Sequence, residues 1–314
     1  MTKTVNYTNM NHFKFGYDGK WFIPRTSRYQ KWMCEYGTAE KQLSIKEANR
    51  QAALEIQKNA DGKQIYLLLS GGADSEVAAR SFIDANVPFT AVILKYKIFE
   101  NDAIVNQEET IHADQLCEQY NIPKKEFFMY PEKFWNSDEY LEIVSISQTR
   151  SPQLACTMWL AKQVDGYVVL GQGEPFIYRQ FGEWWFRERE LIVSWYKFWV
   201  FSGISGAPGF HQYTPEQLLA YLTDPEIIDL VNNPKPSTID GPLSNADVKH
   251  KLYQKHYPES NLNSKKKYTG FENLVFLETV ARMKLIEQFP FCADEFVISY
   301  KDMLLNLKAS YSAG

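Results

Sequence analysis

The stretch that most constrains the fold is residues 65–76, which reads Ile-Tyr-Leu-Leu-Leu-Ser-Gly-Gly-Ala-Asp-Ser-Glu. Five apolar residues predict a buried strand, a turn of small residues follows, and residues 76–85 have the pattern of a helix. This order directs several backbone N–H groups and the positive end of a helix dipole at one point. A phosphate or pyrophosphate group is favoured at such a point.

The residues of this turn suit a phosphate site individually. Gly71 and Gly72 permit positive φ angles and have no Cβ to hold an oxyanion away from the backbone. Ser70 and Ser75 add hydroxyl donors, and the carboxylate of Asp74 is a suitable ligand for Mg²⁺. The alternative is a purely structural connection between strand and helix, because glycines and Ser or Asp caps are common there.

The turn is neither a Walker loop, which has Gly-Lys-Ser/Thr, nor the Gly-x-Gly-x-x-Gly turn of a dinucleotide fold. It resembles the Ser-Gly-Gly-x-Asp-Ser loop of the ATP pyrophosphatases, the PP-loop or adenine nucleotide α-hydrolase-like (HUP) superfamily. The resemblance implies ATP and Mg²⁺ as cofactors and the release of pyrophosphate while AMP is transferred to a substrate. It also implies nucleotide contacts from five residues of the turn, with Asp74 as a metal ligand as well: Ser70, Gly71, Gly72, Asp74 and Ser75.

Strand and helix patterns alternate after this turn. Apolar runs predict further strands at 89–94, 127–129 and 167–170, and helical patterns occur at 76–85, 102–120 and 153–164. The alternation predicts an α/β fold, in which a parallel sheet has helices on both faces. Ligands of such sheets bind at the carboxyl ends of the strands, where Ser70, Leu94 and Gly171 are expected.

Three parts of the chain are predicted. Residues 1–60 form an N-terminal extension that ends in an amphipathic helix, because apolar residues between Ile45 and Ile56 recur at helical spacing. Residues 61–180 form the PP-loop ATP-binding domain. Residues 181–314 form a mainly helical substrate-binding and closing region.

Helical patterns in this last region are expected at 184–186 with 191–201, at 214–222, at 245–257 and at 270–288. The glycine-rich stretch 203–209 is predicted to be a mobile loop. Many aromatic residues lie between Trp135 and Tyr213, a pattern more typical of a core or an interface than of a ligand cage.

A second informative stretch begins at Arg150 and ends in the turn Gly171-Gln-Gly-Glu174. An arginine before a helix, followed by a buried strand and a glycine turn, is expected beside the first turn, where a guanidinium suits a leaving pyrophosphate. A surface arginine that caps a neighbouring element is the alternative. The pattern resembles the synthetase domain of asparagine synthetase and β-lactam synthetase, in which Thr-x-Arg, a helix and Val-Leu-x-Gly-Glu-Gly follow in that order.

The stretch departs from that family pattern in three places. Thr149 directly precedes the arginine, Gln172 stands where the family has its first Glu, and Pro175 stands where it has an Asp. We expect Asp74 to hold Mg²⁺ and Glu174 to supply the second carboxylate from a shifted position, with Asp102 as the alternative second ligand.

The resemblance assigns roles to these residues. It implies that Arg150 and Glu174 are catalytic and that the adenine lies against the backbone near Leu94. It also implies cofactor contacts from Gly171, Gln172 and Gly173.

A basic cluster, Lys265-Lys-Lys-Tyr-Thr-Gly-Phe271, forms the third stretch. Such clusters are usually solvated surface. With Lys249-His-Lys-Leu-Tyr and Pro258 upstream, it resembles the carboxyl-terminal part of the same synthetases, in which a lysine stabilises charge as an amine attacks the adenylated centre. The resemblance implies this catalytic role for Lys267, with Lys265 as second choice.

Composition limits the alternatives. The net charge of −4 disfavours broad nucleic-acid binding. The four cysteines are far apart without a Cys-x-x-Cys pair, which argues against a zinc or iron–sulfur site and a disulfide framework. A reductase of adenylylated sulfate would need a cysteine near the carboxyl terminus, and none follows Cys292. No apolar run approaches the ~20 residues of a membrane span, so we expect a cytoplasmic protein without membrane contacts.

These observations predict an AMP-forming, ATP-dependent ligase with asparagine-synthetase-like amide-bond formation. A carboxylate or amide oxygen of a small-molecule substrate attacks the α-phosphorus, and an amine then attacks the adenylated carbon. The 64 residues before the strand are too few for a glutaminase domain, so the amine is expected from free ammonia, an ammonia-supplying partner or the substrate. The alternatives are a tRNA- or nucleotide-modifying PP-loop enzyme and a non-catalytic nucleotide-binding protein. The oligomeric state is left open.

Overall fold

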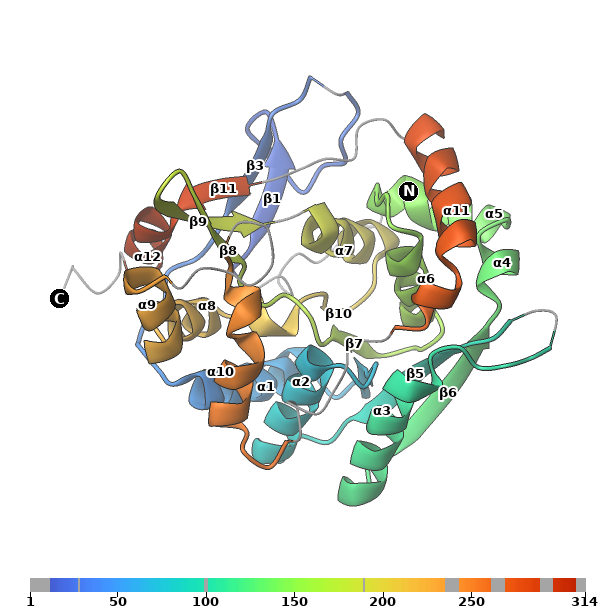
Figure 1. Ribbon diagram of the computed structural model, residues 1–314, viewed down its shortest axis with the longest axis horizontal. Helices are drawn as coiled ribbons and strands as arrows, with labels where there is room; N and C mark the ends of the chain where they lie inside the picture. The colour runs from blue at the N-terminus through green and yellow to red at the C-terminus, as the bar shows by residue number, and fades with distance from the viewer. Residues whose placement is uncertain are drawn as a thin grey trace.

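A five-stranded parallel sheet lies at the centre of the computed structural model (Figure 1). In sheet order its strands are β10 (Gly206–Ala207), β7 (Tyr167–Leu170), β4 (Ile65–Leu68), β5 (Thr90–Tyr96) and β6 (Lys124–Met129). The structure describes residues 12–27, 29–98, 101–188, 190–234, 243–260, 269–288 and 296–308.

Helices cover both faces of this sheet because successive side chains of a strand point to opposite sides. In β4, Ile65 and Leu67 pack into one core, whereas Tyr66 and Leu68 pack into another. The first core includes α1 (Ile45–Ala60), α2 (Ala73–Asp84) and α3 (Gln107–Tyr120). The second includes α5 (Asp138–Ser147), α6 (Pro152–Ala161), α7 (Glu190–Ser202) and α11 (Val275–Gln288). The predicted α/β class is therefore confirmed.

The remaining elements lie outside the parallel sheet. Two three-stranded antiparallel sheets are formed by β1 (Lys14–Tyr17), β2 (Lys20–Trp21) and β3 (Trp32–Glu35), and by β8 (Ile177–Gln180), β9 (Glu183–Glu188) and β11 (Phe296–Ser299). The other helices are α4 (Pro131–Phe134), α8 (Pro215–Leu222), α9 (Pro225–Asn232), α10 (Lys249–His256) and α12 (Tyr300–Lys308). The carboxyl-terminal part is mainly helical, as predicted. Within the described ranges, the helices all fall short of the length and apolarity that a membrane crossing requires.

Two segments differ from the sequence prediction. Residues 184–186 lie in strand β9 and not in a helix, because Trp184 and Phe186 are buried while the residue between them is half-buried, an alternation that suits a strand. The glycine-rich stretch 203–209 supplies the edge strand β10. A Cβ at Gly206, whose φ is +151°, would lie 1.8 Å from the carbonyl oxygen of Val168, so only glycine pairs this closely with β7.

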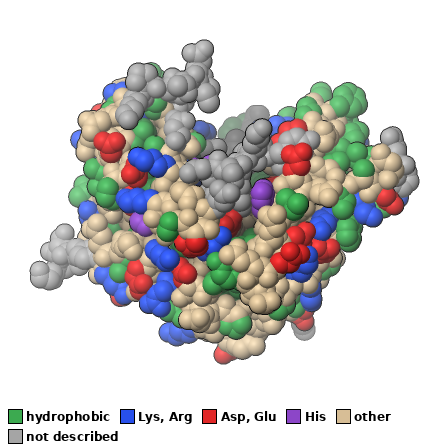
Figure 2. All heavy atoms as spheres, turned by 60° about the horizontal axis from the view of Figure 1, so that its bottom comes forward, with side chains coloured by type: hydrophobic (Ala, Val, Ile, Leu, Met, Phe, Trp, Pro, Cys, Tyr) green, Lys and Arg blue, Asp and Glu red, His purple; other side chains and the backbone are tan. Residues whose placement is uncertain are grey.

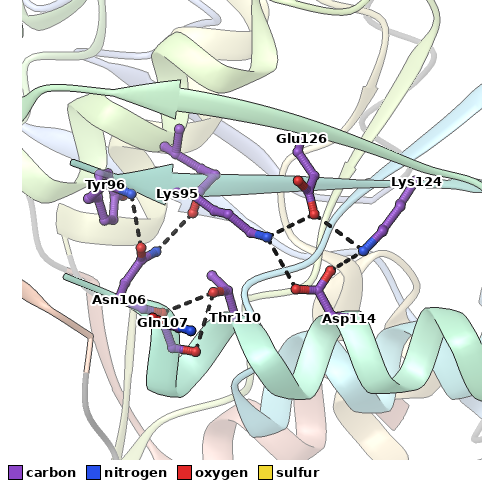
Figure 3. A network of polar contacts seen from close by, with 9 residues as sticks. Lys95, Tyr96, Asn106, Gln107, Thr110, Asp114, Lys124 and Glu126 are labelled. Atoms are coloured by element: carbon purple, nitrogen blue, oxygen red, sulfur yellow. Dashed lines mark hydrogen bonds and ion pairs between the residues drawn. The ribbon is translucent and has the colours of Figure 1, made fainter. Parts of the chain in front are cut away.

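Helix α3 begins at residue 107, five residues later than predicted. Asn106, just before it, uses its side chain to bond the backbone of β5 (Figure 3). The buried carboxamide accepts a hydrogen bond from the Tyr96 amide at 2.9 Å and donates one to the Leu94 carbonyl at 2.8 Å. It thus satisfies two backbone groups at the end of β5. Close by, the Lys95 ammonium joins Asp114 of α3 to Glu126 of β6.

Replacing Asn106 with alanine is expected to lower the free energy of unfolding by about 3 kcal/mol, because two buried backbone groups lose their partners. Urea unfolding of the purified variant measures this loss. Asn233→Ala, at an exposed asparagine after α9, is the matched control and is expected to change stability by less than about 0.5 kcal/mol. Equal losses in both variants would contradict the role given to Asn106.

Candidate functional site

The turn after β4 is closed by its own hydroxyl groups. Ser70 Oγ accepts a hydrogen bond from the Gly72 amide at 3.1 Å and lies 3.2 Å from Ser75 Oγ, which donates to the Gly72 carbonyl at 3.0 Å. Helix α2 begins three residues earlier than the sequence predicted, and its N-cap, Gly72, has no side chain to bond the first-turn amides. Among the described residues, the N-terminus of this 12-residue helix has no side-chain cap from Gly72, so its first-turn amides suit hydrogen bonding to an anion.

Gly71 fixes the position of this turn against α3. Its φ is +94°, and a Cβ at this position would lie 2.0 Å from the carbonyl oxygen of Glu109. A side chain here would push α3 away from the turn. The glycine is therefore required both by backbone conformation and by the close approach of the helix.

The second glycine turn lies against the first. Leu68 pairs with Leu170 in the sheet, so both turns leave it at the same carboxyl edge. A Cβ at Gly171 would lie 2.7 Å from the Cα of Ser75, so the end of β7 directly contacts the first turn of α2. The structure brings together the predicted residues Ser70, Gly71, Gly72, Asp74, Ser75 and 171–174.

Asp74 and Glu174, the two predicted metal ligands, converge on one cation, the ammonium of Lys249. Lys249 Nζ lies 2.9 Å from Asp74 Oδ2 and 3.1 Å from Glu174 Oε1. These three residues are called here the carboxylate–lysine cluster. Lys249 is the first residue of α10, and it was not among the site residues predicted from the sequence.

The charges of this cluster stabilise one another. Burial disfavours the charged form of Lys249, but Asp74 and Glu174 raise its pKa above the ordinary value. Burial likewise acts to raise the pKa of Asp74, but the charge and the hydrogen bond of Lys249 oppose it, and that pKa is lowered. Lys249 and Asp74 are consequently both charged at neutral pH.

His211 forms a hydrogen bond with the backbone of Asp74. Its Nε2 lies 2.9 Å from the Asp74 carbonyl oxygen, which can only accept, so Nε2 carries the proton. Burial lowers the pKa of His211, although Asp74 opposes this, and the imidazole is neutral at pH 7. Its ring stacks on Tyr253 of α10, with ring centroids 5.7 Å apart.

The Asp74 carboxylate lies next to the Tyr253 hydroxyl. Within the described ranges, Asp74 Oδ1 is buried and makes no hydrogen bond of good geometry, and the same is true of the Tyr253 hydroxyl. Burial and the nearby Asp74 carboxylate raise the pKa of Tyr253 well above its usual value. The hydroxyl thus stays protonated beside Asp74.

Asn245 fixes the chain that leaves the second turn. Its amide group donates to the Pro175 carbonyl at 2.6 Å and to the Tyr221 hydroxyl at 3.0 Å, and its oxygen accepts from the Ile177 amide at 3.1 Å. Asn245 therefore ties the segment after Glu174 to α8. Asn245 was not among the site residues predicted from the sequence.

The donor chemistry fits Mg²⁺. Asp74 and Glu174 provide hard carboxylate oxygens that face one point, and Asp74 Oδ1 makes no hydrogen bond of good geometry in the described structure. No group of three or more His, Cys, Asp or Glu side chains that could hold a metal occurs in the described ranges. A magnesium ion held by these two carboxylates would therefore take its other ligands from phosphates and water.

The other predicted residues are less closely connected to this cluster. Arg150 lies at the start of α6, which precedes β7, so it is on the carboxyl edge of the sheet, and Leu94 lies in β5 on the same edge. Asp102 contacts Tyr130 and Lys97. The roles of Arg150 and Leu94 remain predictions. Lys267, Lys265 and Cys292 lie outside the described residues.

Comparisons with known proteins agree with the fold. A family model described as "tRNA methyl transferase HUP domain" matches residues 63–162, from β4 to the end of α6. This match supports the PP-loop or HUP superfamily for the α/β part, and it does not extend to Glu174 or Lys249. No curated protein sequence matches the chain.

Two solved structures are similar at low identity. One is the NMN synthetase from Francisella tularensis, with 16% identity, a TM-score of 0.33, and coverage of 78% of this chain and 97% of that chain. The other is the NH3-dependent NAD synthetase from Campylobacter jejuni in complex with the nitrate ion, with 13% identity, the same TM-score and the same coverage. The family match supports a HUP-like domain for the described α/β part and no particular relative within that superfamily.

Gly71→Ala is expected to lower the free energy of unfolding by about 3 kcal/mol, because the added methyl group meets the Glu109 carbonyl at a strained φ angle. Chemical denaturation measures the loss. Gly62→Ala is the matched control: Gly62 has φ +78°, and a Cβ there meets nothing within 4 Å. Its expected cost is about 1 kcal/mol from conformation alone. Similar losses of unfolding free energy in the two variants would show that the close contact between α3 and the turn does not determine the effect of Gly71→Ala.

Proposed function

We propose that the chain is an ATP-dependent synthetase that releases pyrophosphate from ATP and transfers AMP to a carboxylate or amide oxygen of its substrate, so that an amine can attack the adenylated carbon. The observation that carries the proposal is the uncapped N-terminus of α2 behind Gly71 and Gly72, with Asp74 and Glu174 beside it. The backbone amides can donate hydrogen bonds to a phosphate, and the two carboxylates can bind a divalent cation.

The residues have distinct roles in the proposed reaction. The amides of the first turn, with Ser70 and Ser75, bind the β- and γ-phosphates. Bound Mg²⁺ would neutralise charge on the phosphates, held by Asp74 and Glu174. Arg150, on the same edge of the sheet, stabilises the leaving pyrophosphate.

The acceptor oxygen forms its bond to the α-phosphorus as the bond to pyrophosphate breaks. The resulting acyl or imidoyl adenylate is then attacked by an amine, and AMP leaves. Lys267 is proposed to stabilise the charge that develops in this second step. The carboxyl-terminal region, which contributes α10 and Lys249, is proposed to close over the nucleotide, and the adenine to bind near Leu94.

A tRNA-modifying enzyme is a second candidate, because the matching family model carries that description. The acidic balance argues against it, since the net charge is −4 and basic and acidic side chains are interspersed on the face in Figure 2. Addition of tRNA to the AMP-formation assay separates the two. Stimulation by tRNA, and not by small acceptors, would favour the second candidate.

With a pool of amino acids and metabolites, ATP and Mg²⁺, the protein is expected to release AMP and pyrophosphate only when an acceptor is present. Quantifying both products by chromatography identifies the active fractions. Tight ATP binding without either product, over the whole pool, would instead indicate a non-catalytic nucleotide-binding protein.

Ser70→Ala and Asp74→Asn are each expected to lower acceptor-dependent pyrophosphate release on the order of 100-fold, because each removes a group that faces the phosphates or their metal. Asp229→Asn, at an exposed carboxylate on α9, is the control and should leave the rate unchanged. Undiminished release in the Ser70 and Asp74 variants would place the reaction elsewhere in the molecule.

A further inference from the structure

Lys249 occupies the point at which a divalent cation would contact Asp74 and Glu174. The ammonium is within 3.1 Å of both carboxylates, so it provides the positive charge that the metal would otherwise provide. An ammonium and a magnesium ion cannot share this point, because Mg²⁺ needs direct oxygen contacts at about 2.1 Å and like charges repel.

The contact differs from an ordinary surface ion pair. The side chains of Lys249 and Asp74 are 19% and 24% exposed, whereas Lys251, two residues along the same helix, is 70% exposed and pairs with Glu226. Positions i and i+2 of a helix point in different directions, so only Lys249 reaches the turn.

Helix α10 is held independently of this lysine. Leu252 and Tyr253 are fully buried in the core that includes α8, so the helix keeps its place when the ammonium moves. A lysine side chain has four flexible carbon atoms, and the Lys249 ammonium can shift by several ångströms without movement of the backbone.

The carboxylate–lysine cluster also has a net negative charge. Counted at their formal charges, two carboxylates and one ammonium leave one negative charge. Asp74 Oδ1 makes no hydrogen bond of good geometry in the described part of the chain, and the Tyr253 hydroxyl beside Asp74 brings no positive charge. A nucleotide would bring phosphate oxygens to the N-terminus of α2, beside Asp74. These oxygens offer Lys249 a new anionic partner at the moment when a metal needs the two carboxylates.

We propose that Lys249 is an internal counter-cation of the site. Before nucleotide binds, its ammonium neutralises Asp74 and Glu174 and keeps divalent cations out. When a metal–nucleotide complex arrives, the metal takes the two carboxylates and the ammonium moves to the phosphates. The second step rests on the proposed function, whereas the exclusion of metal from the nucleotide-free protein does not.

The test is a calorimetric titration of the full-length, nucleotide-free protein with Mn²⁺ as the probe. Lys249→Met is expected to bind Mn²⁺ at least roughly tenfold more tightly than the wild type, because the competing ammonium is gone. Lys251→Met, the matched control on the same helix, should bind as weakly as the wild type. Adding Asp74→Asn to Lys249→Met should abolish the gain.

Lys249→Arg keeps the positive charge and should retain the weak Mn²⁺ binding of the wild type, which gives a second variant if the methionine substitution impairs folding. Unchanged Mn²⁺ affinity in Lys249→Met, or a gain that survives Asp74→Asn, would overturn the inference. Tenfold tighter binding of an arginine variant would overturn it as well. Failure of the proposed function would show differently, as absent AMP formation with the Mn²⁺ gain intact.

Discussion

The site depends on the contact of two glycine turns at one edge of the parallel sheet. Gly171 lets the end of β7 lie against Ser75, and Gly71 lets α3 lie against the turn after β4. A Cβ at either position would clash with backbone atoms of a neighbouring element. These two contacts fix the N-terminus of α2, and through it they fix the direction in which Asp74 points.

The fold and the first turn could be predicted from the sequence because their signals are local. The apolar run before Ser70 and the alternation of strands and helices after it lie within short windows. The error at residues 184–186 came from reading aromatic residues as part of a helix, although their burial alternates as in a strand. The edge strand at 206–207 was missed because its pairing depends on a glycine that approaches Val168 across the sheet.

The cluster could be predicted only in part. Its two carboxylates were identified from their places in the glycine turns, whereas Lys249 lies 175 residues from Asp74 in the sequence. Several basic residues occur between 249 and 256, and only the packing of Leu252 and Tyr253 decides which of them faces the turn. The proposal for Lys267 came from resemblance and concerns a residue outside the described ranges. The cluster thus gives the site a cation that sequence patterns did not indicate.

The proposed function requires that the phosphates of ATP bind at the start of α2 and that the bond between the α- and β-phosphates breaks there. Phosphorus NMR of Mg²⁺ and ATP with the protein and a mixture of acceptors tests this most directly. The proposed function predicts that the β- and γ-phosphate signals of ATP shift on binding and that equal amounts of AMP and pyrophosphate then form. Formation of ADP and inorganic phosphate, or ATP signals unchanged by excess protein, would contradict it.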